Sequence, residues 1–237
     1  MLADHPSTAH FISKAIAIRF VSDNPPESLV GRLTETFRRT HGNTREILRT
    51  LVQSPEFWAK EARGAKVKSP FELLASSMRA LNAEVEPGQP CYYWLDRMGQ
   101  PLYSYAPPTG YPDKAASWVN SGTLTYRMNY ALTLAAGRIR GVVVDLSPFQ
   151  SQAPQTTEQE LERVARILLS GRDVARTLAD LKVFVKDPEF PRKVADAARK
   201  KTKPGEQSPE LQPPHRKPPQ LSLVVGILIG SPEFQKR

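Results

Sequence analysis

The sequence predicts a mainly α-helical fold: an irregular multi-helix domain with long proline-rich loops and at most one or two short strands. Three observations support this class. Apolar residues recur at the spacing of one helix face along most of the chain. Several of these segments open with a capping motif, in which a Ser, Thr or Asn is followed three residues later by Glu. The chain also holds 22 prolines, most of them outside the periodic segments, which predicts long irregular connections.

Three helices are predicted in the first 52 residues. The first spans residues 7–20 and ends before Asn24-Pro25-Pro26, and the second spans 26–40 and stops at Gly42. The third opens at the capping motif of residues 43–46. The apolar positions expected to face inward are Phe11, Ile12, Ala15 and Ile16, then Leu29, Val30, Leu33 and Phe37, then Ile47, Leu48, Leu51 and Val52.

Four more helical segments are predicted further along. The motif of residues 69–72 opens a helix, a second helix spans 123–136 before Gly137, a third opens at the capping motif of residues 157–160, and a fourth runs from 174 to 186. Residues 141–145 are the only run typical of a strand. The apolar positions expected to face inward are Leu73, Leu74, Met78 and Leu81, then Leu124, Met128, Leu132 and Ala135, then Leu161, Val164, Ala165 and Leu168, then Val174, Leu178, Leu181 and Val185.

These segments predict a division into three regions. Residues 1–200 form a helical domain, residues 201–220 form a Pro/Lys-rich linker or long loop, and residues 221–237 form a short C-terminal helix that docks on the body. Three copies of one motif, at residues 54–57, 187–190 and 231–234, each follow an apolar segment. A cap residue, a proline, a Glu and a Phe in this order are typical of a corner between helices, so we interpret the motif as structural.

Charge and cysteine content limit the classes of function. The net charge of +9 is spread along the chain, and residues 192–203 are the one concentrated basic run. A solvated helix end explains that run, so we expect no nucleic-acid partner, although phosphate binding stays the alternative. Cys91 is the only cysteine, so no internal disulfide or thiolate metal cluster can form. Residues 1–6 show no signal-peptide pattern, and the longest apolar run, 221–229, is about half the length of a membrane span.

Several motifs occur in the order seen in a bacterial family. They include His5-Pro6-Ser7-Thr8-Ala9-His10-Phe11-Ile12, Arg19-Phe20-Val21-Ser22-Asp23-Asn24-Pro25-Pro26, Ser54-Pro55-Glu56-Phe57-Trp58, Pro107-Pro108-Thr109-Gly110-Tyr111-Pro112 and Gly230-Ser231-Pro232-Glu233-Phe234-Gln235. Over nearly its whole length the chain resembles the family called domain of unknown function 1800.

The resemblance implies properties that the residues do not show by themselves. Family members are usually at least twice this length, which implies that the chain is the C-terminal portion of a longer protein. The missing N-terminal half is then one expected partner, and an envelope protein or a glycan is another. Export signals in relatives imply a periplasmic or secreted location. No reaction is established for the family, so the resemblance assigns no catalytic residue.

The candidate binding surface is the aromatic stretch of residues 92–130. It holds all seven tyrosines and two of the three tryptophans, with four prolines and no Phe. Tyr and Trp combine an apolar face with a polar tip, which suits stacking against sugars or peptides. Packing of an irregular loop by its own rings is the alternative. The residues proposed to bind a ligand or partner are Tyr103, Tyr105, Tyr111, Trp118, Asn120, Arg127 and Asn129.

The sequence shows no catalytic motif, no metal-spaced cluster and no cofactor-binding loop, so no cofactor and no metal are expected. His5 is the one histidine retained as a possible functional residue, although a structural role at the start of the first helix, as a cap or in packing, is the favoured explanation. Asp4 and His5 are the only acid and imidazole adjacent in sequence. Two functions therefore stay open: a helical structural or interaction module that is not catalytic by itself, and the C-terminal half of an enzyme whose catalytic residues lie mostly outside this chain.

Overall fold

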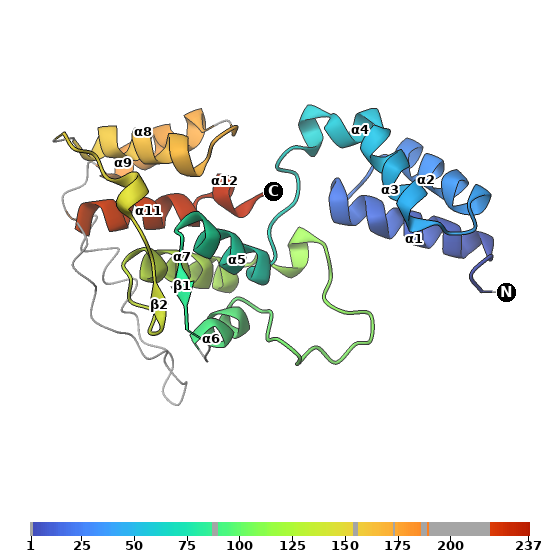
Figure 1. Cartoon of the computed structure of the whole chain (residues 1–237), viewed down its shortest axis with the longest axis horizontal. Coiled ribbons are helices and arrows are strands. Elements are labelled where there is room, and N and C mark those ends of the chain that lie inside the picture. Colours follow the sequence, from blue (N-terminus) through green and yellow to red (C-terminus); the bar gives the residue numbers. More distant parts are fainter. Residues whose placement is uncertain (1, 87–89, 154–155, 173, 186–188, 190–218) are drawn as a thin grey trace. The chain divides into compact units, whose positions relative to one another are not determined.

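The computed structural model describes residues 2–86, 90–153, 156–172, 174–185, 189 and 219–237. These residues form helices joined by irregular segments, with a single two-stranded sheet among them, which confirms the mainly α class (Figure 1). The chain divides into two compact units, which are described separately. The first consists of residues 1–68, 112–117 and 236–237, and the second of residues 69–111 and 118–235. Among the described residues, no helix has the length and apolar character needed to cross a membrane.

The first unit is built on three helices and a proline corner. Its three long helices begin within two residues of the predicted positions, and the first two also end within two residues of theirs. Gly42 (φ 79°) ends the second by donating its N–H to Phe37 O (2.8 Å). The core holds Ala17, Val21, Leu29, Val30, Leu33, Ile47 and Leu51. The elements are α1 (Pro6–Phe20), α2 (Glu27–Arg39), α3 (Thr44–Gln53), α4 (Pro55–Trp58) and the 3-10 turn Lys60–Ala62, with a second 3-10 turn at Ala115–Ser117.

The buried stripe of α1 differs from the prediction. Phe11, expected to face inward, is 70% exposed, and Ala15 is also exposed. The buried residues are instead Ala9, Ser13 and Ala17, at four-residue spacing. Small side chains at this spacing let α2 pack closely against α1, which a search for large apolar residues overlooks.

Two expectations for α3 were also wrong. Val52 is 47% exposed rather than inward. The Asn43 side chain does cap the helix by accepting the N–H groups of Arg45 (3.1 Å) and Glu46 (3.4 Å), but the Asn43 N–H donates to Thr40 O and not back to the Glu46 carboxylate. The Glu46 carboxylate instead pairs with Arg49 at 2.7 Å.

A buried ion pair holds the segment 112–117 within the first unit. The Lys66 side chain is only 3% exposed, and its ammonium donates to an oxygen of Asp23 and to Asp113 O. The other Asp23 oxygen accepts the Ala115 N–H at 2.7 Å, and Arg19 Nη1 lies 2.6 Å from Asp113 Oδ1. Burial would raise the pKa of Asp23, but the hydrogen bonds from Lys66 and Ala115 and the Lys66 charge outweigh it, so the pKa lies below its ordinary value.

The second unit holds the larger core. One short antiparallel pair joins its two strands, with Glu84 opposite Val143 and Val85 opposite Val142. Residues 141–145 thus contribute the predicted strand, and the partner strand was not foreseen. The elements are α5 (Pro70–Ala80), β1 (Glu84–Val85), α6 (Pro90–Arg97), α7 (Ser121–Ala135), β2 (Val142–Val143), a 3-10 turn at Ser147–Phe149, α8 (Thr157–Leu168), α9 (Ala175–Val185), α11 (Pro219–Gly230) and α12 (Pro232–Gln235).

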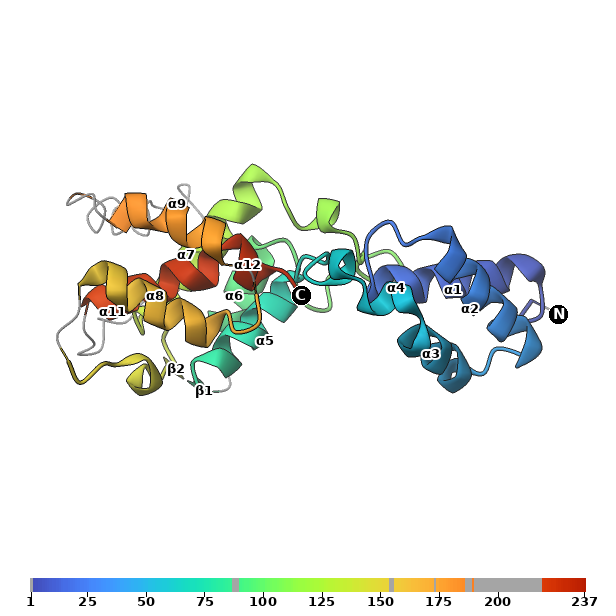
Figure 2. The same ribbon diagram turned by 90° about the horizontal axis from the view of Figure 1, so that it is seen from above.

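Helix α11 lies at the centre of this unit, against α7 and α8 (Figures 1 and 2). It begins at Pro219, two residues before the helix expected from the sequence, so residues 219–220 are helical rather than part of a linker. Residues 201–218 of the expected linker lie outside the described residues. Gly226 allows the close approach to α7, because a Cβ atom there would lie 3.0 Å from Leu132 Cα.

The capping motifs of the second unit are largely confirmed. Ser69 and Glu72 form the complete capping box of α5, and all four apolar residues expected to be inward there are buried. The box of α8 is complete too, but it starts one residue earlier than expected, with Thr156 as the cap and Gln159 as its partner. In α7 the expected face was partly wrong, because Leu124 is 43% exposed.

Two of the three predicted proline corners lie within the described residues, and both are present. Pro55 and Pro232 are the first residues of α4 and α12, as expected for a corner. The Ser54 hydroxyl donates to Leu51 O (2.6 Å), and the Ser231 hydroxyl accepts the Phe234 N–H (3.4 Å). The third copy, at 187–190, lies outside the described residues except for Glu189.

Candidate binding surface

The irregular segment that follows α6 is the green trace between α6 and α7 in Figure 1. Trp94, Leu95 and Met98 are buried in the core, and Gly99 at φ 93° turns the chain out of the helix. The side-chain oxygen of the next residue, Gln100, accepts the Phe71 N–H of α5 at 2.8 Å. The segment therefore leaves the core from a fixed point.

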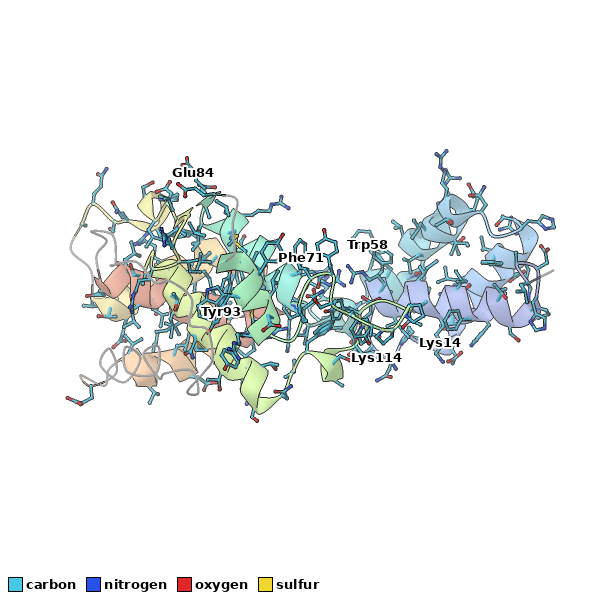
Figure 3. All side chains as sticks on the ribbon, turned by 90° about the horizontal axis from the view of Figure 1, so that it is seen from below. Lys14, Trp58, Phe71, Glu84, Tyr93 and Lys114 are labelled. Carbon is cyan, nitrogen blue, oxygen red and sulfur yellow. The ribbon has the colours of Figure 1, made fainter. Side chains whose placement is uncertain are left out.

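The helix before the segment carries its own ring contacts. Tyr93, labelled in Figure 3, packs edge to face on Trp94 with ring centroids 5.5 Å apart. The Arg97 guanidinium lies 5.4 Å from the Tyr93 ring centroid and 6.0 Å from that of Tyr126 on α7. These aromatic residues of the predicted stretch therefore bind α6 to α7.

A tight turn then presents Tyr103 to solvent. The Ser104 N–H donates to Pro101 O (3.4 Å), which closes a four-residue turn with Tyr103 in its third position. The Tyr103 φ of 60° lies in the left-handed region, which turns of this kind usually give to Gly or Asn. Its side chain is 99% exposed. Tyr103 therefore occupies a costly backbone conformation without burying its ring.

Three further rings form a ladder beside this turn. The Tyr105 and Tyr111 ring centroids lie 4.3 Å apart with 36° between the ring planes. Tyr111 in turn contacts Trp118, at 5.7 Å and 46°. Trp118 is 3% exposed, whereas Tyr105 is 38% exposed, so the ladder runs from the interior to the surface.

The hydroxyl of Tyr111 closes the segment on itself by donating to Pro101 O. Burial, followed by the neighbouring Tyr105 and Asp96, raises the pKa of Tyr111 above its ordinary value, so the hydroxyl stays protonated as this bond requires. Residues 101–111 thus form a surface loop with joined ends, a type often used for function. We name it the tyrosine loop.

The three polar residues expected beside the rings lie on α7 or at its start. Asn120 caps the helix, since its side chain accepts the Thr123 N–H at 2.9 Å and the Thr123 hydroxyl accepts the Asn120 N–H. Arg127 is wholly buried, and its Nη1 donates to Gln235 Oε1 at 3.2 Å. Burial lowers the pKa of Arg127 to about 10, which leaves the side chain charged at neutral pH. Asn129 is half-buried. The structure therefore brings Tyr105, Tyr111 and Trp118 together, leaves the Tyr103 side chain in solvent on the same loop, and places Arg127 away from the surface.

His5 is the cap of α1, and its Nδ1 accepts the Ser7 N–H at 3.2 Å. This contact is the capping role weighed for it from the sequence. Asp4 lies near His41, with 3.9 Å between Asp4 Oδ1 and His41 Nδ1. Sequence reasoning missed this pair because 37 positions separate the two residues. Within the described ranges, no three His, Cys, Asp or Glu side chains gather as a metal site would require.

Comparison with known protein families places the chain. The family model described as "Protein of unknown function (DUF1800)" matches residues 1–236. The chain belongs to the DUF1800 family. No curated protein and no solved structure matches it. The DUF1800 assignment confirms the resemblance inferred from the motifs, and it brings no activity with it, so any function has to be argued from the site.

Proposed function

We propose that this DUF1800 chain is a helical interaction module whose contact surface is the tyrosine loop, with Tyr103 as its main anchor. The exposure and backbone conformation of Tyr103 carry the proposal. A non-glycine residue in the left-handed region costs about 1–2 kcal/mol. With the ring 99% exposed, no burial of that side chain within the chain offsets this cost. A role in contact with another molecule accounts for a tyrosine at this position.

The loop is suited to present such an anchor. Pro101, Pro107 and Pro108 restrict the backbone, and the Tyr111 hydroxyl bond to Pro101 O joins its ends. The Tyr105 ring packs on Tyr111, and Tyr111 packs on the buried Trp118, so these contacts join the loop to the core. A loop held in this way loses little conformational entropy on binding, which favours affinity.

The arrangement of the rings favours a protein over a glycan as the partner. Tyr105 and Tyr111 cover one face of each other at 4.3 Å, so Tyr103 is the one ring of the tyrosine loop with both faces open for stacking against a sugar. Tyr103 projects from the loop rather than lining a hollow, which suits insertion into a concave partner surface. Tyrosine is among the residues most enriched at the energetic centres of protein interfaces.

The test compares wild type with Tyr103→Gly, using Tyr92→Ala as a matched control. Tyr92 is also an exposed tyrosine, at 50%, but it lies on α6 outside the tyrosine loop. Each tagged variant is incubated with the envelope fraction of the source cells and with a panel of immobilised polysaccharides. The proposal expects one or more proteins retained by wild type and Tyr92→Ala, with at least tenfold weaker retention by Tyr103→Gly.

Two outcomes would overturn the proposal. One is a protein profile that Tyr103→Gly leaves unchanged. The other is retention of a polysaccharide that depends on Tyr103 while no protein does, which would replace the protein partner with a glycan.

A further inference from the structure

The tyrosine loop lies within residues 98–112, a run that contains no Lys, Arg, Asp, Glu or His. Charged residues make up 24% of the chain, and only one other run without them is as long, residues 218–232. That second run contains α11, whose residues 224–230 are all buried in the core. A buried helix has no use for charged side chains, but residues 103–110 are all exposed. Burial within the chain therefore does not explain why the tyrosine loop lacks charge.

The charged residues on either side of the run are engaged elsewhere. The Arg97 guanidinium lies over the rings of Tyr93 and Tyr126. Asp113 Oδ1 lies 2.6 Å from Arg19 Nη1. The chain thus places charges before and after the tyrosine loop but none on it.

Several polar groups of the loop bond to one another. The Ser104 N–H donates to Pro101 O, and the Ser104 hydroxyl donates to Leu102 O at 3.3 Å. The Tyr111 hydroxyl also donates to Pro101 O. A donor that loses water without another partner is costly, whereas these donors already have partners within the loop. The loop is therefore suited to leave water when it binds.

The absence of charge matters at a surface that loses its water on binding. A charged side chain gives up its hydration when it enters an interface, and only a well-placed partner charge compensates for this. The centres of protein interfaces are accordingly depleted of charged residues and enriched in tyrosine. The exposed residues 103–110 have this composition, with two tyrosines, two prolines and no charge.

Building on the proposed function, we infer that the tyrosine loop enters an uncharged, apolar hollow of its protein partner and that no ion pair holds it there. Tyr103 fills the hollow, and Pro107 and Pro108 extend the apolar contact. Binding then comes from the removal of apolar surface from water, which salt does not screen. The net charge of +9 would instead favour an acidic partner held by ion pairs.

Salt separates these two kinds of partner. The probe is the envelope fraction of the source cells, and the readout is the amount of each protein that wild type retains and Tyr103→Gly does not, in about 0.1 M and about 1 M NaCl. An uncharged hollow predicts a change of less than about threefold, and an acidic partner predicts a fall of about tenfold or more. Asp96 of α6 acts on the Tyr111 hydroxyl, and Asp96→Asn should bind like wild type.

Charges placed next to Tyr103 test the hollow itself. Ser104→Lys and Ser104→Glu should each weaken retention at least about tenfold, because a charge of either sign would lose its water. Ser104→Ala removes the hydroxyl without adding charge and should bind like wild type. Ala179→Lys and Ala179→Glu are the matched controls, since Ala179 is exposed on α9 outside the tyrosine loop. Circular dichroism checks that every variant is helical.

Three results contradict the inference and leave Tyr103 as a contact residue. They are a fall in retention of about threefold or more at high salt, opposite effects of Ser104→Lys and Ser104→Glu, and retention of both charged variants at the level of Ser104→Ala. Tighter binding of Ser104→Lys with weaker binding of Ser104→Glu would assign an acidic partner instead. The proposed function fails by a different result, the absence of any retained protein that depends on Tyr103, and the inference then fails with it.

Discussion

At the scale of single residues, the conformation of Tyr103 allows a substitution that removes the proposed contact without lowering the stability of the chain. Replacing this residue by Gly removes a side chain that is 99% exposed and relieves a positive φ, at the cost of a more flexible unfolded chain. We expect Tyr103→Gly to leave the free energy of unfolding unchanged or to raise it by up to about 1 kcal/mol, as measured by urea denaturation.

A β-branched residue at the same position is the control. Tyr103→Val should lower the free energy of unfolding by about 1 kcal/mol or more, because a branched Cβ fits the left-handed region poorly. A clear loss of stability in Tyr103→Gly would mean instead that the tyrosine ring contributes to internal packing.

The ion pair between Asp23 and Lys66 makes the stability of the first unit depend on pH. Because the folded pKa of Asp23 lies below its ordinary value of 3.8, the pair contributes stability above that pH and loses it as the pH falls further. We expect Asp23→Ala to cost about 3 kcal/mol at neutral pH, since it leaves the buried Lys66 ammonium without its carboxylate. Urea denaturation between pH 2 and 7 measures both effects.

The double variant Asp23→Ala/Lys66→Met separates pairing from packing. It should be more stable than Asp23→Ala, because no buried charge is left behind, and the difference from wild type should shrink as the pH falls below about 4. Equal stability of the single and double variants across this range would show that the pair does not carry the effect.

At the scale of elements, capping chemistry was predicted well and helix orientation less so. The caps Asn43 and Ser69 could be predicted because a cap and its partner lie within four residues. The buried stripe of α1 could not, because Ala9, Ser13 and Ala17 face inward for their small size. Which face is buried depends on the neighbouring helix, and periodicity within one segment does not contain that information.

The contact between α7 and α11 rests on a glycine. A Cβ atom at Gly226 would lie 3.0 Å from both Leu132 Cα and Leu132 Cδ2, so the two helices would have to separate. We expect Gly226→Ala to lower the free energy of unfolding by about 1–3 kcal/mol, although alanine favours an isolated helix. Thermal unfolding followed by circular dichroism measures this change.

Gly31 of α2 is the control for the intrinsic preference of alanine. Nothing lies within 4 Å of a Cβ atom there, so Gly31→Ala should stabilise the chain by up to about 1 kcal/mol. If Gly226→Ala stabilised the chain to the same extent, the close packing of α7 on α11 would be contradicted.

At the scale of the whole molecule, two hydrophobic cores share no residue. One lies among α1, α2 and α3, and the other among the helices from α5 to α12. Leu33→Ala removes a wholly buried side chain of the first core and should cost it about 2–5 kcal/mol. Hydrogen exchange should then rise in α1, α2 and α3, while α7 and α11 keep their protection. An equal rise in both sets would mean that the chain unfolds as one unit.

The tyrosine loop shows what sequence can say about a site. Binding at this loop stays a prediction, but the concentration of tyrosines in residues 92–130 did mark the part of the chain that contains the loop, because composition is visible without a structure. It could not separate the exposed Tyr103 from the buried Tyr130, whose hydroxyl bonds Ser77 across the core at 2.8 Å. It also could not show that Arg127 lies inside, because burial arises from contacts between distant segments.

Contact at Tyr103 is the central claim of the proposed function, and site-specific cross-linking tests it most directly. A photoreactive phenylalanine derivative replaces Tyr103 in one variant and Tyr92 in another, and each is irradiated in the source cells. The account predicts a discrete cross-linked protein from position 103 that is missing from position 92. Identical adducts at both positions, or none at 103 when the protein is present at its normal level, would contradict it.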